Sequence, residues 1–391
     1  MAVLRPVAVA SDASALSMLP VVADALDGRL SVLPVPADDA RETSLLTTSL
    51  RAGDEIHDDV AVVVSTSGTT GVPKGAMLTA AALTASADAT HARLGGPGRW
   101  LLALPAHHVA GLQVLVRSVV AGTTPAAITP SFSVAELVSA VSSLGPGRRY
   151  ASLVAVQLAK ALGDAAATAA LASLDAVLIG GGPLPGELGR RAAEAGIAVV
   201  RTYGMSETAG GCVYDGVALD GVRVRIQAGA GTSNQGRVVL GGATIAKGYR
   251  NPVEPDPFAE SGWFRTDDLG ALDDSGRLTV LGRVDEAIST GGLTVLPQLV
   301  EAALATHPAV AECAVFGVPD DRLGQRVAAA VVVAPGAAAP TVAALREHVA
   351  QTLDVTAAPR EIHVVDKLPR RGIGKVDRRA LAARFTGHGM M

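Results

Sequence analysis

The chain has 391 residues, of which 49% are hydrophobic, and a formal net charge of −4 at pH 7. This length favours two domains over one, and the hydrophobic content excludes a disordered polymer. The negative charge argues against a general affinity for nucleic acid. Apolar stretches are too short to span a bilayer, and the two cysteines, Cys212 and Cys313, suit a reducing compartment. We therefore expect a soluble, cytoplasmic protein without a membrane span.

In chain order, the first half alternates strand-like apolar runs with helix-like segments. Strands are predicted at 60–64, 100–106, 150–156, 174–182 and 197–204, and helices at 75–94, 111–122, 133–145, 156–162 and 186–196. Such alternation is typical of parallel sheets whose faces are covered by helices. We therefore predict an α/β fold for this part of the chain.

The pattern changes after about Val213. From there to Gly282, short runs separated by Gly, Asn and Asp predict a small β-rich subdomain of antiparallel strands. Helices are then predicted at 296–306 and 341–353, and strands at 312–318, 326–333 and 361–366. These elements form an α+β unit of about a hundred residues. We place the boundary so that residues 1–284 form a large N-terminal domain and residues 285–391 a small, mobile C-terminal domain.

A loop rich in glycine and hydroxyl residues follows the strand predicted at 60–64. Its sequence, STSGTTGVPKGAML over 65–78, offers backbone N–H groups, hydroxyl donors and Lys74 to phosphate oxygens. It departs from the P-loop pattern G-x-x-x-x-G-K-[ST], because Lys74 follows Pro73 and precedes Gly75. A simple flexible turn is the alternative interpretation.

The loop resembles the phosphate-binding signature of the adenylate-forming superfamily, which includes acyl-CoA synthetases, luciferases and peptide-synthetase adenylation domains. Four further segments resemble signatures of that superfamily in the same order: RTYGMSETAG at 201–210, GWFRTDDLG at 262–270, GRVDEAISTGG at 282–292 and PRRGIGKVDRRAL at 369–381. Taken singly, Tyr203, Glu207 and Lys375 would more often be a core residue, a solvated acid and a surface charge. Five signatures in order outweigh those interpretations.

The resemblance implies that the chain uses ATP, Mg²⁺ and coenzyme A. The expected ATP-binding residues are Ser67, Gly68, Thr69, Thr70, Gly71, Lys74, Gly181, Gly182, Tyr203, Gly204, Ser206, Asp268, Arg283 and Lys375. By the same resemblance, the loop holds the β- and γ-phosphates, Tyr203 lies against the adenine and Ser206 contacts the α-phosphate. Asp268 and Arg283 face the ribose. Glu207 is the expected magnesium ligand, which suits a cation that takes few protein ligands.

Lys375, His108 and Thr69 are the catalytic residues that the resemblance implies. Lys375 would neutralise charge between the attacking carboxylate and the α-phosphate. Asp285 is the expected pivot of a domain swing that brings Gly291 and Gly292 to the site for the coenzyme A step.

Two features depart from the family pattern. Asp267 stands where glycine is usual, so the choice of Asp268 rests on register. Only 64 residues precede the loop, so we expect a shortened first subdomain.

The segment LPAHHVAGLQVLVRSVVAG at 104–122 resembles the acyl-pocket region of the superfamily, whose histidine aligns with His108. The segment SLVAVQLAKAL at 152–162 continues the match. Its Ser-Leu-Val-x-x-Gln-Leu pattern, the short N-terminus and SETAGGCVYDG at 206–216 together make the chain resemble the o-succinylbenzoate–CoA ligases of menaquinone synthesis most. The expected substrate-binding residues are His108, Gly204, Gly210 and Gly211. Whether His107 or His108 faces the site stays open.

Other functions stay open as well. The chain could be another aryl- or fatty acyl-CoA synthetase, an adenylation domain that loads a carrier protein, or a degenerate binding module. Degeneracy is disfavoured because polar residues for every step are present. A small carboxylic acid and coenzyme A are the expected partners, and homo-oligomerisation is an expectation from the family.

Overall fold

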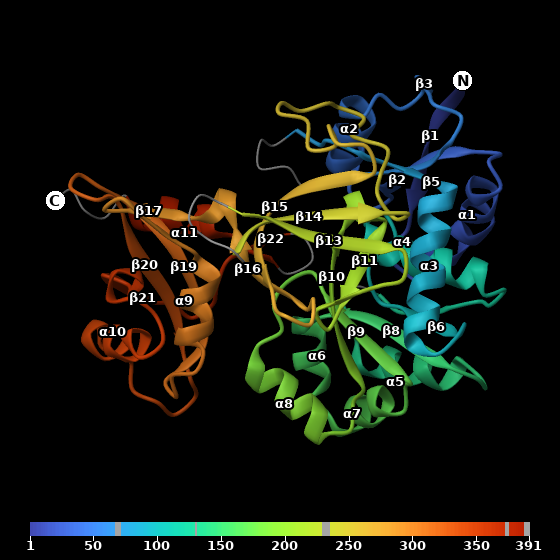
Figure 1. Ribbon diagram of the computed structural model, residues 1–391. Helices are drawn as coiled ribbons and strands as arrows, with labels where there is room; N and C mark the ends of the chain where they lie inside the picture. Colours follow the sequence, from blue (N-terminus) through green and yellow to red (C-terminus); the bar gives the residue numbers. More distant parts are fainter. Residues whose placement is uncertain (67–71, 130, 229–234, 372–374, 387–391) are drawn as a thin grey trace. The chain divides into compact units, whose positions relative to one another are not determined.

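The computed structural model describes residues 1–66, 72–129, 131–228, 235–371 and 375–386 (Figure 1). The chain divides into two compact units. Unit 1 comprises Met1–Arg225, Val239–Thr266 and Asp274–Leu278, and unit 2 comprises Ile226–Val238, Asp267–Asp273 and Thr279–Met391. The boundary expected between residues 284 and 285 stays a prediction.

A five-stranded sheet of order β3-β1-β2-β4-β5 begins unit 1. Its strands are β1 (Ala2–Val9), β2 (Ser31–Pro36), β3 (Glu55–Ile56), β4 (Val60–Val64) and β5 (Ala76–Thr79). Strands β1, β2 and β4 are parallel, whereas β3 and β5 pair antiparallel at the two edges. The connections contain η1 (Ala13–Ser17), α1 (Met18–Leu26) and α2 (Ala40–Ser49). Every residue of β4 is buried, so the predicted phosphate loop begins at the end of a fixed strand.

The predicted first residue of the helix over 75–94 was wrong, because the helix begins later in the structure. Residues Ala76–Thr79 form β5, and α3 begins only at Ala80 and ends at Leu94. The side chain of Thr79 accepts a hydrogen bond from the Ala82 N–H at 3.1 Å. Threonine is a strong N-cap residue, so it sets the first turn of the helix here.

A seven-stranded sheet of order β12-β11-β10-β9-β8-β6-β7 forms the second layer of strands in unit 1. Its strands are β6 (Arg99–Leu102), β7 (Ala126–Ala127), β8 (Arg149–Val154), β9 (Ala176–Gly180), β10 (Val199–Met205), β11 (Gly210–Tyr214) and β12 (Val217–Ala218). The strands from β10 to β7 are parallel, which confirms the predicted parallel sheet, and β11 and β12 are antiparallel.

Helices supply the apolar side chains that cover this second sheet. The helices are α4 (Val109–Val120), α5 (Val134–Ser143), α6 (Ala155–Ala161), α7 (Ala165–Ala172) and α8 (Gly186–Glu194). One core joins Leu101 and Leu153 of the sheet to Leu137, Leu158 and Leu171 from α5, α6 and α7. Helices α3 and α4 contact each other, and both contact β11.

A four-stranded sheet has the order β13-β14-β15-β16. Its strands are β13 (Val222–Ala228), β14 (Gln235–Gly242), β15 (Trp263–Leu272) and β16 (Leu278–Arg283). They correspond to the short strands expected in this region of the sequence.

Unit 2 also contains a five-stranded sheet, with order β18-β17-β20-β19 and β21 paired with β20. The strands are β17 (Ile288–Thr290), β18 (Leu293–Val295), β19 (Val310–Asp320), β20 (Gly324–Val333) and β21 (Glu361–Val364). Helices α9 (Pro297–Leu304) and α10 (Val342–Ala350) cover one face, and α11 (Arg378–Thr386) covers the other. A short hairpin of β22 (Arg370–Arg371) and β23 (Lys375–Val376) precedes α11. No helix in the described part of the chain has the length and apolarity needed to cross a membrane.

Polar side chains are buried around Trp100 in unit 1. The Trp100 Nε1–H donates to His91 Nε2 at 3.4 Å, and the Arg117 guanidinium lies 4.7 Å from the Trp100 ring centroid. Burial, reinforced by the charge of Arg117, lowers the pKa of His91 to about 4. His91 is therefore a neutral hydrogen-bond acceptor at pH 7.

The stability of unit 1 should fall as the pH is lowered from 6.5 toward 4, because the unfolded chain binds a proton at His91 that the folded chain does not. His91→Gln, which keeps an acceptor for Trp100, should weaken this pH dependence. Urea unfolding followed by tryptophan fluorescence at about pH 7 and pH 5 measures it. Burial also lowers the pKa of His107, so His107 still makes the unfolding free energy depend on pH in the variant. We therefore expect the pH dependence to become smaller but not to disappear. An unchanged dependence would contradict the assignment to His91.

Candidate active site

The carboxyl edge of the seven-stranded sheet brings several predicted site residues together. Gly181 and Gly182 follow β9, and Ser206 and Glu207 follow the neighbouring β10. His108 follows β6 in the same sheet and is the N-cap residue of α4. Parallel strands end at a common edge, and ligands of open α/β sheets bind outside that edge. The topology thus gives a physical reason for a placement that was expected only from the resemblance.

Glu207 is a buried carboxylate with a defined orientation. It lies in the short 3-10 helix η2 (Ser206–Thr208), and its exposed fraction is 7%. The Tyr249 hydroxyl donates to Glu207 Oε1 at 2.6 Å, and the Glu207 carbonyl accepts from the Ala246 N–H at 2.9 Å. The residue predicted to bind magnesium is therefore oriented by the protein. Tyr249 was not among the predicted site residues, and no pattern around it in the sequence indicated this contact.

Lys74 lies where the chain leaves the predicted phosphate loop. Its Nζ is 5.2 Å from the centroid of the Tyr249 ring, which is a cation–π distance. The Lys74 carbonyl accepts from the Asn251 N–H at 2.9 Å, and Asn251 Nδ2 donates to the Pro73 carbonyl at 2.8 Å. The segment 247–251 thus holds the backbone of Pro73 and Lys74, which follow the loop residues 67–71 in the chain.

The predicted loop residues Ser67, Gly68, Thr69, Thr70 and Gly71 lie outside the described residues. At the start of the loop, the Ser206 hydroxyl is 3.5 Å from the Ser65 carbonyl oxygen. The buried Thr66 Oγ1 has no hydrogen-bond partner among the described residues. Buried hydroxyls are usually paired, so an unpaired one beside the loop is consistent with a ligand there.

These side chains fit a magnesium–nucleotide complex. Mg²⁺ is usually bound through one or two carboxylates together with phosphate oxygens and water, rather than by an all-protein cage. In the described part of the chain, no group of three or more His, Cys, Asp or Glu side chains could hold a metal ion. The oriented Glu207 carboxylate could contribute to such a metal site, and Lys74 and the Thr66 hydroxyl, which has no partner among the described residues, suit contacts with phosphate oxygens.

The three glycines predicted near the substrate lie in the β10–β11 pair, where two backbones approach closely. A Cβ on Gly204 would lie 2.1 Å from the Gly210 carbonyl oxygen, and one on Gly211 would lie 2.8 Å from Tyr214 Cε1. Gly210 has a φ of 103°, which favours glycine. Strand packing alone explains these glycines, so their contacts with ATP or the acid stay predictions.

His107 and His108 differ in environment. Their ring centroids are 4.3 Å apart, but His107 is only 8% exposed whereas His108 is half-buried. Burial, followed by the neighbouring His108, lowers the pKa of His107 to about 4. His107 is therefore neutral at pH 7.

Tyr203 is half-buried on β10, and its carbonyl accepts a hydrogen bond from Cys212 Sγ at 3.6 Å.

In unit 2, Arg283 is surrounded by carboxylates. Its Nε and Nη2 donate to Asp285 at 2.8 and 3.0 Å, and its Nη1 donates to Asp268 at 3.4 Å. Burial opposes the charge of Arg283, but the hydrogen bonds to Asp285 and the nearby Asp268 and Asp267 raise its pKa. The Asp268 side chain is 9% exposed and that of Asp267 is 49% exposed, because successive residues of β15 face opposite sides. This alternation supports the choice of Asp268.

The remaining predicted residues of unit 2 lie in two hairpins. Gly291 and Gly292, with φ of 59° and 82°, form the two-residue turn between β17 and β18. Positive φ at both positions is typical of a type I′ hairpin turn. Lys375 begins β23, where it pairs with Arg371.

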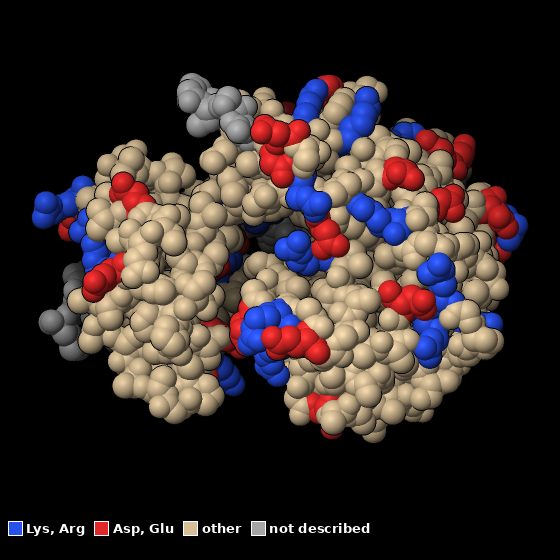
Figure 2. Space-filling view, turned by 60° about the horizontal axis from the view of Figure 1, so that its bottom comes forward, with Lys and Arg blue, Asp and Glu red and all other residues tan. Residues whose placement is uncertain are grey.

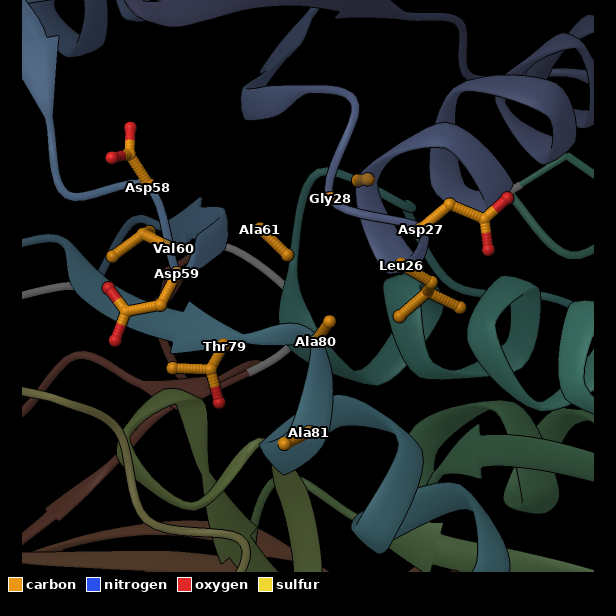
Figure 3. A pocket seen from close by; sticks show the side chains of 11 residues that line it. Leu26, Asp27, Gly28, Asp58, Asp59, Val60, Ala61, Thr79, Ala80 and Ala81 are labelled. Atoms are coloured by element: carbon orange, nitrogen blue, oxygen red, sulfur yellow. The ribbon is translucent and has the colours of Figure 1, made fainter. Parts of the chain in front are cut away.

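A hollow of about 310 Å³ beside β4 and β5 is a different feature (Figure 3). Its three carboxylates are all paired: Asp27 with Arg29 at 2.7 Å, Asp58 with the N-terminal amine at 3.0 Å, and Asp59 with Lys247 at 2.7 Å. None of the predicted site residues lines it. Elsewhere on the surface, acidic and basic side chains lie next to one another on the face shown in Figure 2.

Comparison with known proteins gives matches over most of the chain. A family described as AMP-binding enzyme matches residues 7–250, and its C-terminal domain family matches residues 299–375. A probable 2-succinylbenzoate–CoA ligase of Mycobacterium tuberculosis is 71% identical over 346 residues, which cover 88% of this chain and 89% of that protein. A 2-succinylbenzoate–CoA ligase of Bacillus licheniformis is 34% identical over 348 residues, which cover 84% of this chain and 71% of that protein.

Solved structures agree with this result. The o-succinylbenzoate CoA synthetase of Bacillus subtilis, in complex with its acyl-adenylate intermediate, matches with a TM-score of 0.80 and 26% identity over 97% of this chain and 88% of that chain. The same synthetase with ATP and magnesium matches with a TM-score of 0.79 and 26% identity over 96% of this chain and 89% of that chain. The predicted fold class and the resemblance to the adenylate-forming superfamily are thereby confirmed, and the chain belongs to the AMP-binding enzyme family.

Proposed function

We propose that the chain is an AMP-forming, ATP- and Mg²⁺-dependent 2-succinylbenzoate–CoA ligase that serves menaquinone biosynthesis. The observation that carries the proposal is the 71% identity, over 88% of this chain, to a probable ligase of that specificity. The oriented Glu207 carboxylate and Lys74, both in contact with Tyr249, support the use of magnesium and ATP.

The reaction has two balanced steps. First, a carboxylate oxygen of the acid attacks the α-phosphorus of ATP, the bond from that phosphorus to the bridging oxygen breaks, and pyrophosphate leaves. Second, the sulfur of coenzyme A attacks the acyl carbon, the bond from that carbon to the phosphate oxygen breaks, AMP leaves, and the thiol proton passes to solvent. Catalysis of the first step depends on alignment and charge neutralisation.

The residues of unit 1 bind and orient the phosphates in this proposal. Lys74 and the loop residues Ser67, Gly68, Thr69, Thr70 and Gly71 hold the β- and γ-phosphates, and Ser206 contacts the α-phosphate. Glu207 holds Mg²⁺, which neutralises charge on the leaving pyrophosphate when bound. Gly181, Gly182 and Gly204 also bind ATP, and Tyr203 lies against the adenine. The acid is bound by His108, Gly204, Gly210 and Gly211.

The predicted residues of unit 2 have further roles in this proposal. Asp268 and Arg283 bind the ribose, and Lys375 stabilises the charge that develops during adenylation. Asp285 is the pivot, and Gly291 and Gly292 act in the coenzyme A step. We place the pivot at the boundary between domains 1–284 and 285–391 and the enzyme in the cytoplasm. Homo-oligomerisation is an expectation from the family.

The substrate assignment has a direct test. Coenzyme A-dependent AMP formation should be faster with 2-succinylbenzoate than with benzoate, acetate or medium-chain fatty acids, by about 10²-fold or more in kcat/KM. The reason is that 2-succinylbenzoate has a second carboxylate, which is not activated. Polar groups of the site that pair with this carboxylate stay unpaired when an analogue lacks it. A higher kcat/KM for medium-chain fatty acids would contradict the assignment and favour a fatty acyl-CoA synthetase.

The role of Lys375 separates the two half-reactions. Lys375→Ala should slow adenylation by about 10²–10³-fold, which is typical for one electrostatic group in a closed site. Transfer of the acyl group from preformed adenylate to coenzyme A should stay near the wild-type rate. Lys367→Ala, which removes an exposed lysine of the same unit, is the control for both rates. Equal loss of both steps in a folded Lys375→Ala variant would contradict this role.

A further inference from the structure

An ion-pair network in unit 2 connects a residue close to the predicted catalytic lysine, Lys375, with a residue next to the predicted pivot, Asp285. Arg378, the first residue of α11, comes three residues after Lys375. Glu286, in the 3-10 helix η3 (Val284–Glu286), directly follows Asp285. Arg378 contacts both Glu286 and Glu301 of α9, so Arg378 is the central residue of the network.

The contacts are short and involve every nitrogen of the guanidinium. Arg378 Nη2 donates to Glu301 Oε1 and Oε2 at 2.9 and 2.7 Å, and its Nε donates to Oε1 at 3.2 Å. Arg378 Nη1 donates to Glu286 Oε2 at 3.0 Å. Glu301 Oε1 also accepts from the Val315 N–H at 2.7 Å, so the network includes β19. A bidentate pair of this kind fixes direction as well as distance.

The network is largely shielded from water. The side chains of Arg378, Glu301 and Glu286 are 19%, 15% and 28% exposed. Burial raises the pKa of Glu301, and the charge of Arg378 opposes that shift. Buried ion pairs are often no more stable than apolar substitutes of similar volume, so stability alone is a weak explanation for this one.

The backbone between Lys375 and Arg378 is fixed at both ends. Lys375 pairs with Arg371 in the β22–β23 hairpin. The Asp377 N–H donates to the Pro369 carbonyl at 2.8 Å, and Asp377 Oδ1 accepts from the Ala380 N–H at 3.1 Å at the start of α11. A displacement of Arg378 would therefore be transmitted to the strand that carries Lys375.

We propose that Arg378 is a positioning residue: through Glu286 and Glu301 it fixes the Lys375 strand relative to the first residue after the pivot. The inference rests on the proposed function, because it requires Lys375 to act in adenylation. Arg378 acts through Lys375, so it matters for adenylation and not for acyl transfer.

Arg378→Lys keeps the charge but loses the bidentate contact. It should lower kcat of adenylation by about tenfold, with KM for ATP and acyl transfer from preformed adenylate both near wild type, because small misplacements of a catalytic group are costly. Glu286→Gln should show a smaller loss in the same step. Arg379→Lys, a change at the adjacent exposed arginine, is the matched control and should alter neither step. Parallel loss of both steps would indicate a merely structural role and overturn the proposal.

A double-mutant cycle tests whether Arg378 acts through Lys375. Adding Arg378→Lys to Lys375→Ala should cause no further loss of adenylation, whereas independent effects would multiply. Multiplied losses would overturn the proposal while leaving the proposed function intact.

Amide hydrogen exchange gives a readout that does not depend on the acid substrate. Arg378→Lys should increase exchange in residues 375–378, and Arg379→Lys should not. Unchanged exchange in Arg378→Lys would overturn the proposal. Absence of adenylation by the wild type with 2-succinylbenzoate would instead overturn the proposed function, and the exchange result would still decide the role of Arg378.

Discussion

The buried hydrogen bond from Tyr249 to Glu207 is the interaction on which the candidate site of unit 1 depends. A carboxyl group that is only 7% exposed requires hydrogen-bond partners, and the Tyr249 hydroxyl at 2.6 Å is one of them. The same tyrosine ring lies 5.2 Å from Lys74 Nζ. One aromatic residue thus orients the predicted metal ligand and contacts the predicted phosphate ligand. Two side chains that are predicted to contact the same magnesium–nucleotide ligand thus share one aromatic neighbour.

The position of Tyr249 follows from the backbone around it. Residues 247–251 run beside Lys74–Met77: the Met77 N–H donates to the Gly248 carbonyl, and the Lys247 N–H donates to the Met77 carbonyl, both at 2.9 Å. Because β5 also pairs with the fully buried β4, the residues after the predicted loop are fixed on two sides. Rigid surroundings of this kind let a glycine-rich loop bind phosphate with a defined geometry. The chemistry of adenylation requires alignment above all, and the fold provides rigid strand ends for it.

Much of the fold could be predicted from the sequence because its signals are local. The apolar run at 60–64 and the alternation of strands and helices are visible within short windows, and they correspond to β4 and to the parallel sheets. The predicted start of α3 was wrong for a physical reason. Alanine-rich sequence favours a helix, but Ala76–Thr79 pairs with β4 and is therefore a strand. Tyr249 and Arg378 were missed for another reason. Their partners Glu207 and Glu301 are 42 and 77 residues away along the chain, and no periodic pattern connects such positions.

Isotope exchange between pyrophosphate and ATP shows whether this site activates a carboxylic acid as an acyl adenylate. Exchange requires reversible formation of the adenylate and does not require the thiol step. We expect exchange that depends on Mg²⁺ and 2-succinylbenzoate and proceeds without coenzyme A. Exchange that occurs only when coenzyme A is present, or formation of ADP instead of AMP, would contradict it.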